Sequence, residues 1–187
     1  MPALEIKTLS LGELSVSGKG SKSIPLYSQD APLVWRPGPL RVQWQPKAYN
    51  DPEANRVAVC FQATDAVEAY LHVLEDWVIK TLALAPKKFF GQDLSESQIR
   101  ERYNPAIKVS QKGYSHLKAK MNIAGRTGVR CWDTETRAQR KQPDDWTMCE
   151  VQPSLEIKGL WVMNKDFGLV IEMTDALISE SSTLCPF

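Results

Sequence analysis

Metal-binding side chains are scarce in this sequence. It contains two histidines and four cysteines in 187 residues, and no two cysteines have the Cys-x-x-Cys spacing of a zinc cluster or a redox dithiol. Two histidines are too few for a three-histidine metal site. A cross-strand site of Cys131, Cys149 and His116 is the alternative, but dispersed cysteines are most often buried structural thiols, so we expect no metal.

Enzyme motifs are missing as well. The chain has no Gly-x-x-x-x-Gly-Lys phosphate loop, no Gly-x-Gly-x-x-Gly turn and no Gly-x-Ser-x-Gly nucleophile motif. Two adjacent carboxylate pairs, Glu75-Asp76 and Asp144-Asp145, fall on a predicted polar helix face and in a predicted loop, where carboxylates are usually solvated. We therefore expect no catalysis and no cofactor. A metal-dependent nuclease is an alternative that requires carboxylates converging from several strands.

Long apolar runs are also absent. No window reaches the roughly 18 consecutive apolar residues of a membrane span, and the opening MPALEIKTLSLGEL lacks the basic-then-apolar order of a signal peptide. We therefore expect an intracellular protein without a membrane partner. The hydrophobic fraction of 43% and the charged fraction of 24% are typical of a globular domain and exclude a disordered chain.

Charge is nearly balanced overall but unevenly distributed. Residues 100–130 carry eight cations and one carboxylate, a net charge of +7, whereas residues 61–99 and 131–187 carry −3 and −5. A basic block within a neutral chain is typical of a surface that binds polyanions. The alternative is a solvated basic face that acidic segments neutralise in the fold.

Apolar alternation predicts a mainly β protein. Short β-prone runs lie between prolines and glycines in the first 62 residues, and in LRVQWQ the alternation predicts that Leu40, Val42 and Trp44 face inward. Strands return after residue 107, and Asn164-Lys165-Asp166 predicts a hairpin between the last two. Many short strands interrupted by a helical segment are typical of a small barrel or sandwich.

Helical signals are confined to about residues 64–104. An amphipathic helix is predicted over 65–83, capped by Thr64 or Asp65. Pro86 should end it, with KKFFG as a loop. A capping box from Ser95 to Gln98 then predicts a second, shorter helix.

The segment GYSHLKAKM, residues 113–121, lies at the centre of the basic block. Its alternation predicts a strand with Tyr114, His116, Lys118 and Lys120 on one face and small or apolar residues on the other. Cations that contact phosphates and rings that stack on bases are the two components of single-stranded nucleic-acid sites. AGRTG should then turn the chain into a partner strand beginning at VRCW.

Further candidates for the same site lie around this strand. Of the tryptophans, Trp35 and Trp132 are expected to be exposed, whereas Trp77 and Trp161 are expected to be buried. We assign phosphate contacts to Lys108, Lys112, Lys118, Lys120, Arg126 and Arg130, base stacking to Tyr114, His116 and Trp132, and supporting positions to Trp35 and Arg41.

Two segments carry a resemblance to a known family. KKFFGQDLSESQIRERYNPAIKVSQKGYSHLKAKM, residues 87–121, resembles the Phe-Phe-Gly, short helix, Tyr-x-Pro, Lys, Tyr, Lys-x-Lys progression of single-stranded DNA-binding proteins from large DNA viruses and phages. SLEIKGLWVMNKDFGLVIEMTDALI, residues 154–178, resembles their closing strand pair. The resemblance covers about residues 60–178. Ser115 and His116 depart from the family pattern, which often has prolines there.

The resemblance implies an OB-like β-barrel with added elements, acting in viral or phage DNA replication and recombination. It places Tyr103, Lys108, Tyr114, Lys118 and Lys120 on or beside the binding face. The compartment would be the host cytoplasm or nucleus, and RNA is an alternative ligand because the 2′-hydroxyl is read by local geometry.

We therefore predict a non-catalytic, largely sequence-independent single-stranded DNA-binding protein. Residues 1–178 should form one OB-like domain with a helical excursion at about 64–104, and residues 179–187 a flexible tail that docks replication proteins. A homo-oligomer is compatible with the sequence. The rival to this prediction, besides the nuclease, is a virion structural or assembly protein with a β-sandwich.

Overall fold

The computed structural model describes residues 4–179 except residues 19, 49–50, 52 and 148. The expected tail therefore lies, apart from Ser179, outside the described residues. In chain order the elements are η1 (Ile6–Thr8), β1 (Leu9–Leu11), β2 (Ser15–Val16), β3 (Lys22–Ser28), β4 (Ala31–Trp35), β5 (Leu40–Arg41), β6 (Arg56–Gln62), α1 (Asp65–Ala83), α2 (Pro86–Phe90), α3 (Glu96–Arg102), β7 (Ile107–Val109), β8 (Ser115–Asn122), β9 (Arg130–Asp133), β10 (Gln139–Arg140), β11 (Glu150–Met163) and β12 (Asp166–Ser179).

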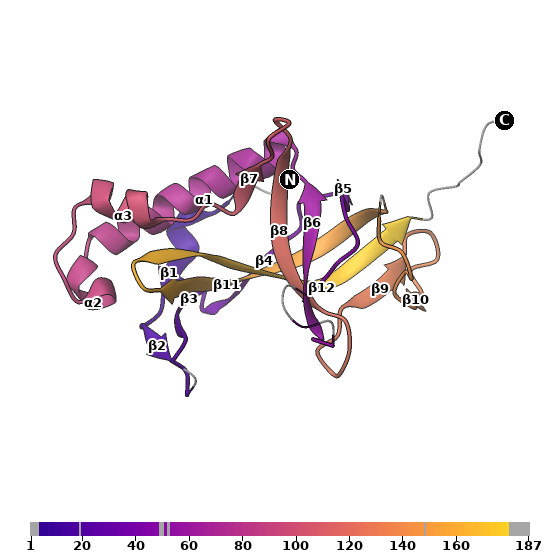
Figure 1. Cartoon of the computed structure of the whole chain (residues 1–187), viewed down its shortest axis with the longest axis horizontal. Coiled ribbons are helices and arrows are strands. Elements are labelled where there is room, and N and C mark those ends of the chain that lie inside the picture. The colour runs from indigo at the N-terminus through magenta and orange to yellow at the C-terminus, as the bar shows by residue number, and fades with distance from the viewer. Residues whose placement is uncertain (1–3, 19, 49–50, 52, 148, 180–187) are drawn as a thin grey trace.

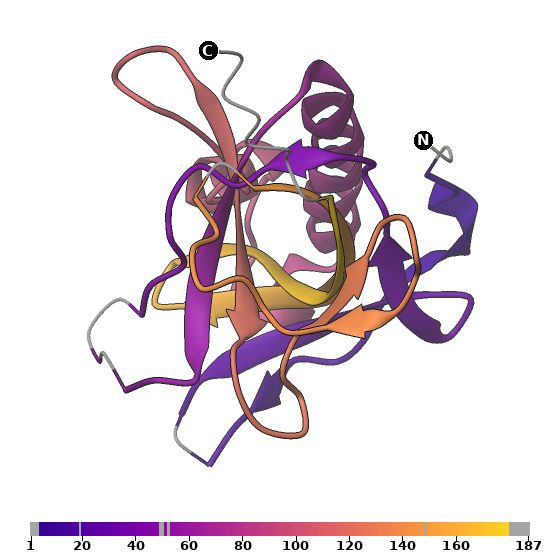
Figure 2. The same cartoon turned by 90° about the vertical axis from the view of Figure 1, so that its right-hand side faces the viewer.

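The twelve strands of the described residues form one sheet. Its main path runs β1-β3-β4-β11-β12-β8-β6, and β9 extends β12 in parallel. β11 and β12 make the long antiparallel hairpin predicted from the sequence, with Asn164 and Lys165 as its turn. Figure 2 shows the sheet curling into a half-barrel, so the expected mainly β, OB-like architecture with helices added is confirmed.

The helices cover one end of this sheet, where the β11–β12 hairpin turns (Figure 1). Thr64 caps α1 by accepting a hydrogen bond from the Val67 amide, 3.4 Å, and the predicted limits 65–83 are confirmed. The apolar side of α1 is buried in the main core. The capping box of α3 between Ser95 and Gln98 is present as expected. KKFF is a short helix rather than a loop, because Pro86 occupies its first turn, where no amide hydrogen is needed.

Two expectations for tryptophans in the first third were wrong. Trp35 is only 2% exposed, because the pleat of β4 turns it toward the core, where its ring stacks on Tyr70 of α1 with centroids 4.4 Å apart. Trp44, expected to face inward, is 53% exposed. Its segment bridges β6 at Val42↔Phe61 and Lys47↔Ala58, so four residues, 43–46, lie opposite two. This local bulge breaks the alternation and turns the indole outward.

Among the described residues, no helix is long and apolar enough to cross a membrane.

Candidate nucleic-acid interface

The outer face of β8 carries the cations that the sequence placed there. Leu117, Ala119 and Met121 are buried in the core, whereas Lys118 is exposed and Lys120 is half-buried. The predicted alternation of this strand is therefore confirmed. Leu117 and Met121 anchor it from behind through apolar burial, which leaves the lysines on the opposite surface.

Neighbouring strands widen this face. β6 runs antiparallel beside β8, with Cys60 opposite Lys118 and Arg56 opposite Asn122. On the other side of β8, the short strand β7 places Lys108 opposite His116. Because directly paired residues point to the same side of a sheet, side chains from three strands share one outer surface. We call this surface, the outer side of β6, β7 and β8, the basic face.

The basic face is electrostatically crowded. Burial lowers the pKa of Lys120 below its usual value, and the positive charges of Lys118 and Arg56 lower it further. Burial raises the pKa of the Cys60 thiol, although Lys118 and Lys120 act in the opposite direction. Like charges held this close would be stabilised by a polyanion that lies across them.

A pocket opens where β8 and β12 separate. These two strands run parallel and pair only at Glu172↔Lys120. Beyond that position, the segment Tyr103–Val109 lies between them. The backbone amide of Asn104 donates a hydrogen bond to the backbone carbonyl of Phe167 on β12 at 2.7 Å. The pocket, which we call the fork pocket, has a volume of about 520 Å³. It is lined by Arg56, Asn104, Pro105, Ala106, Lys108, Lys118, Ala119, Lys120, Trp161, Leu169, Val170 and Ile171.

Two further hollows continue from the fork pocket along the basic face. Lys118 also lines a hollow with Trp44, Lys47 and Cys60. Trp44 in turn lines a third hollow at the β7–β8 turn. That third hollow is lined by Arg41, Gln43, Trp44, Gln62, Ser110, Gln111, Lys112 and Tyr114. Shared residues join the three hollows into one path over the outer surface.

Aromatic rings accompany the cations on this path. Tyr114 is 61% exposed at the β7–β8 turn. The Trp44 ring meets His116 edge-on with centroids 5.6 Å apart, and Trp161 enters the fork pocket from β11. A strand of nucleotides following the hollows would meet rings and cations in alternation, the combination that single-stranded nucleic-acid sites use.

Some predicted site residues do not join this path. Arg130 and Trp132 lie on β9. We expected this strand to pair with β8, but it pairs with β12 and β10. Both side chains bind the Asp175 carboxylate, Arg130 at 2.8 Å and the Trp132 indole nitrogen at 3.1 Å. Arg126 is exposed in the connection between β8 and β9. Because β9 pairs with β12, the last part of the basic block does not lie on the basic face.

Tyr103 has a supporting place rather than an exposed one. Its ring packs edge-on against Phe167, with centroids 5.2 Å apart, and it lies partly buried. Burial raises its pKa, and the neighbouring Glu75 carboxylate raises it further. Glu75 itself accepts a hydrogen bond from the Ala106 amide at 2.8 Å. Tyr103 and Glu75 therefore hold the segment that walls the fork pocket.

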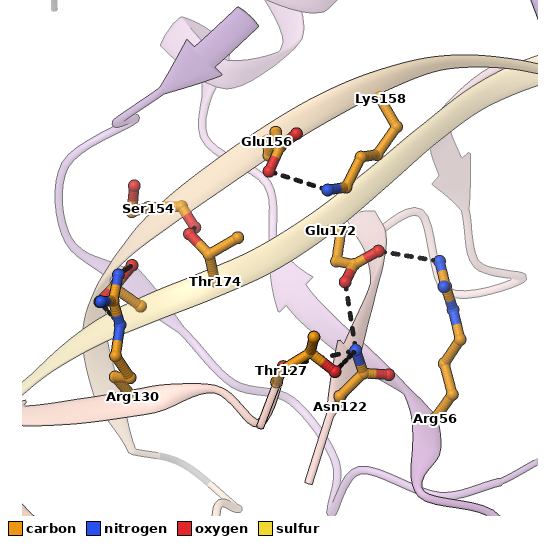
Figure 3. Close-up of polar contacts among 10 residues, drawn as sticks. Arg56, Asn122, Thr127, Arg130, Ser154, Glu156, Lys158, Glu172 and Thr174 are labelled. Atoms are coloured by element: carbon orange, nitrogen blue, oxygen red, sulfur yellow. Dashed lines mark hydrogen bonds and ion pairs between the residues drawn. The ribbon is translucent and has the colours of Figure 1, made fainter. Parts of the chain in front are cut away.

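On the outer side of β11 and β12, cationic side chains bind carboxylates. Figure 3 shows Lys158 with Glu156 and Arg56 with Glu172, at 2.9 and 3.0 Å. The side-chain amide of Asn122 also donates a hydrogen bond to the Glu172 carboxylate, at 3.3 Å. We call this surface, together with the Arg130–Asp175 pair, the paired face. Arg56 stands at the boundary between the two faces.

Sequence reasoning missed three residues of the path: Trp44, Trp161 and Arg56. Trp161 was expected to be buried, yet it lines the fork pocket. A signal was present for Arg56 and Trp161, since Arg56 begins a β-prone run and Trp161 follows Gly159 within another. Gly159 has a φ of 138° and marks a register shift in β11, so residues beyond it change the face they would have had in a regular strand.

Metal ligands do not gather in the described part of the chain. No group of three or more His, Cys, Asp and Glu side chains there could hold a metal ion. Cys131 is buried, and burial raises the pKa of its thiol to about 11.

The fold defined by these elements is that of phage single-stranded DNA-binding proteins. The single-stranded DNA-binding protein from bacteriophage Enc34, in complex with single-stranded DNA, matches with a TM-score of 0.50 and 10% identity over 89% of this chain and 93% of that one. Its C-terminally truncated form matches with a TM-score of 0.50 and 11% identity, over 89% and 94% of the two chains.

A second phage protein has the same fold. The crystal structure of gp2.5, a single-stranded DNA-binding protein encoded by bacteriophage T7, matches with a TM-score of 0.56 and 10% identity over 80% of this chain and 87% of that one. No family profile and no curated protein sequence matches the chain. The resemblance seen in the sequence is thereby confirmed as a likeness of fold.

Proposed function

We propose that this chain is a non-catalytic protein that binds single-stranded DNA, largely independently of sequence, along the basic face. One observation carries the proposal: three hollows, the first two joined at Lys118 and the last two at Trp44, follow the outer side of β6 and β8 and combine cations with aromatic rings. Such a path fits a flexible strand whose phosphates meet lysines and whose bases meet rings.

The arrangement favours single strands over duplex. Duplex readers usually insert a basic helix into the major groove, whereas the polar side of α1 carries Glu68 and Asp76. Asp76 is bound to Lys80 at 2.7 Å and to Arg100 of α3 at 2.7 Å, so this carboxylate is neutralised within the protein. The basic face instead offers rings that a paired base could not reach.

The comparisons support the same class of ligand. A protein with this fold is known in complex with single-stranded DNA, and the other neighbour is a single-stranded DNA-binding protein as well. By analogy of fold we assign the chain to phage or viral DNA replication or recombination, inside the host cell. We keep the proposal of one OB-like domain over residues 1–178 and of a tail that docks replication proteins.

Individual residues take the following roles in this proposal. Lys108, Lys118 and Lys120 contact successive phosphates, and Tyr114 and His116 stack on bases, with Trp44 added to them. Lys112 and Arg41 extend the path around the β7–β8 turn, and Arg126 supplies charge beyond the other end of β8.

The test is a fluorescence-anisotropy titration at two salt concentrations with an oligonucleotide of about 12 nucleotides, within the ~4–16 that one OB fold covers. Lys118→Ala combined with Lys120→Ala should weaken binding at least about tenfold and reduce the slope of log affinity against log salt by about 1.4, or about 0.7 for each lost phosphate contact. Lys7→Ala combined with Lys87→Ala is the matched control, since both lysines are exposed and lie outside the three hollows.

Competing ligands and activities are separated in the same experiment. Single-stranded RNA and duplex DNA of equal length test the ligand, and Mg²⁺-dependent shortening of the oligonucleotide would indicate the nuclease. A wild-type protein that binds no oligonucleotide but forms large assemblies would instead favour the virion protein. Equal affinity of the lysine pair variant and its control would show that the basic face is not the site.

A further inference from the structure

We propose that the fork pocket captures a single unstacked nucleobase of the bound strand, so that one nucleotide is fixed in register while the rest of the path only follows the backbone. This inference rests on the proposed function and deepens it. Its ligand is one nucleotide unit: a planar base inside the pocket and phosphates at the rim.

The walls of the fork pocket have the chemistry that a base requires. Its lining includes the aliphatic and aromatic residues Leu169, Val170, Ile171 and Trp161. The charged groups that line it are all cations, from Arg56, Lys108, Lys118 and Lys120, and no carboxylate is among its described lining residues. An apolar interior suits the face of a base, and a cationic rim suits the phosphates on either side.

The size of the pocket agrees with this occupant. Its volume of about 520 Å³ lies within the ~300–1,000 Å³ of ordinary small-molecule sites. The hollow at the β7–β8 turn is lined by Trp44 and Tyr114 together with residues such as Gln43, Gln62 and Lys112. Both of these rings are exposed and suit surface stacking, whereas Trp161 is half-buried beside the fork pocket.

A glycine on β12 lets Trp161 form one wall. Trp161 of β11 lies opposite Gly168, and a Cβ at Gly168 would come within 3.0 Å of the indole nitrogen and 2.7 Å of the Asn104 carbonyl oxygen. The indole and the Asn104 segment therefore occupy the space that a side chain at this position would need. Because Gly168 has no Cβ, the ring reaches across β12 and lines the pocket.

The opposite wall is held in place before any ligand arrives. The Asn104 amide donates to Phe167 and the Ala106 amide donates to Glu75, which ties the wall to both β12 and α1. Lys108 follows on β7, where its ammonium group donates to the Asn104 side chain. A wall fixed on two sides loses little freedom on binding, so a base can enter without a large ordering cost.

The first experiment compares two probes that share a backbone. Probe one is single-stranded oligo(dT) of about 12 nucleotides, and probe two has the same length with every base removed. Val170→Trp fills the fork pocket without changing charge. Val34→Trp adds the same bulk at a β4 position that is 47% exposed and lines none of the three hollows.

We expect Val170→Trp to weaken oligo(dT) binding about tenfold, the loss of one stacked base, and to leave binding of the abasic probe unchanged. Val34→Trp should bind both probes like wild type. If wild type binds oligo(dT) but the Val170→Trp and Val34→Trp variants bind it equally tightly, the base pocket is overturned while the proposed function stands. If wild type binds no single strand, the proposed function itself fails.

A second measurement tests base capture without filling the fork pocket. In protein labelled with 5-fluorotryptophan, the Trp161 resonance is assigned by its loss in Trp161→Phe. It should shift on addition of oligo(dT) and stay in place with the abasic probe. A shift with both probes, or with neither, contradicts base capture. Thymidine monophosphate should bind far more weakly than the oligonucleotide, and tight saturable binding of it would reassign the pocket to a free nucleotide.

Discussion

Two surfaces of the same curled sheet hold cations in different electrostatic surroundings. On the basic face, burial lowers the pKa of Lys120, and the positive charges of Lys118 and Arg56 lower it further. On the paired face, Lys158 and Arg130 each bind a carboxylate. The difference teaches that a count of basic residues does not define a polyanion site. A cation whose charge is already compensated gains less from a phosphate.

Charge reversal should give the largest difference in DNA affinity between the two faces. We expect Lys118→Glu to weaken single-stranded DNA binding roughly 100-fold at low salt, because one phosphate contact is lost and a carboxylate faces the strand. Lys158→Glu makes the same charge change on the paired face and should alter affinity less than about threefold. Anisotropy titrations of the two variants check this, and similar losses in both would contradict it.

The lowered pKa of Lys120 predicts a dependence on high pH. Bound phosphates favour the charged ammonium, so affinity should fall as pH rises through the lowered pKa of Lys120, before ordinary lysines lose their protons. We expect wild-type affinity to fall between pH 8 and pH 10. Lys120→Arg, which stays charged, should hold its affinity over that range. A flat wild-type profile would show that Lys120 does not contact phosphate.

Releasing a paired cation should sharpen the boundary between the faces. Glu172→Gln frees Arg56, which also lines the fork pocket, and should strengthen binding about threefold while adding up to ~0.7 to the salt slope. Asp175→Asn frees Arg130, which lies on β9 away from the path, and should leave affinity unchanged. If Asp175→Asn strengthens binding as much as Glu172→Gln, the path runs over β9 as well.

The smallest effect concerns stability in acid. Although burial raises the pKa of Asp175, hydrogen bonds from Arg130 and Trp132 lower it below the usual value. Its contribution to folding is therefore complete above the unfolded-state pKa and is lost as pH falls through the folded-state pKa. Asp175→Asn should lower the unfolding free energy by less than about 1 kcal/mol at neutral pH and less still in acid. Urea unfolding at several pH values measures this, and a difference that grows in acid would contradict it.

Local periodicity made much of this structure predictable. The alternation of GYSHLKAKM, the cap of α1 at Thr64 and the turn at Asn164 depend on neighbours in the sequence, and each was found as expected. These features placed the basic strand correctly. They were also enough for a mainly β fold with a helical segment.

Features that depend on distant pairing were not predicted from the sequence. Trp44 faces outward because its segment bulges against β6, and Trp161 reaches the fork pocket because a glycine lies opposite it on another strand. Arg130 left the site because β9 pairs with β12. Trp35 lies in the core, where Tyr70 of α1 stacks on it. In each case the deciding partner lies far away along the chain.

The most direct test of a strand lying on the basic face is to map backbone amide chemical shifts by NMR during titration with oligo(dT). We predict that the chemical-shift changes concentrate in β7, in β8, in the segment around Trp44 and in the segment Asn104 to Ala106. The amides of β9 and of β11 around Glu156 and Lys158 should not change. Shifts confined to β9 and β11, or shifts in no segment at saturating oligonucleotide, would contradict the account.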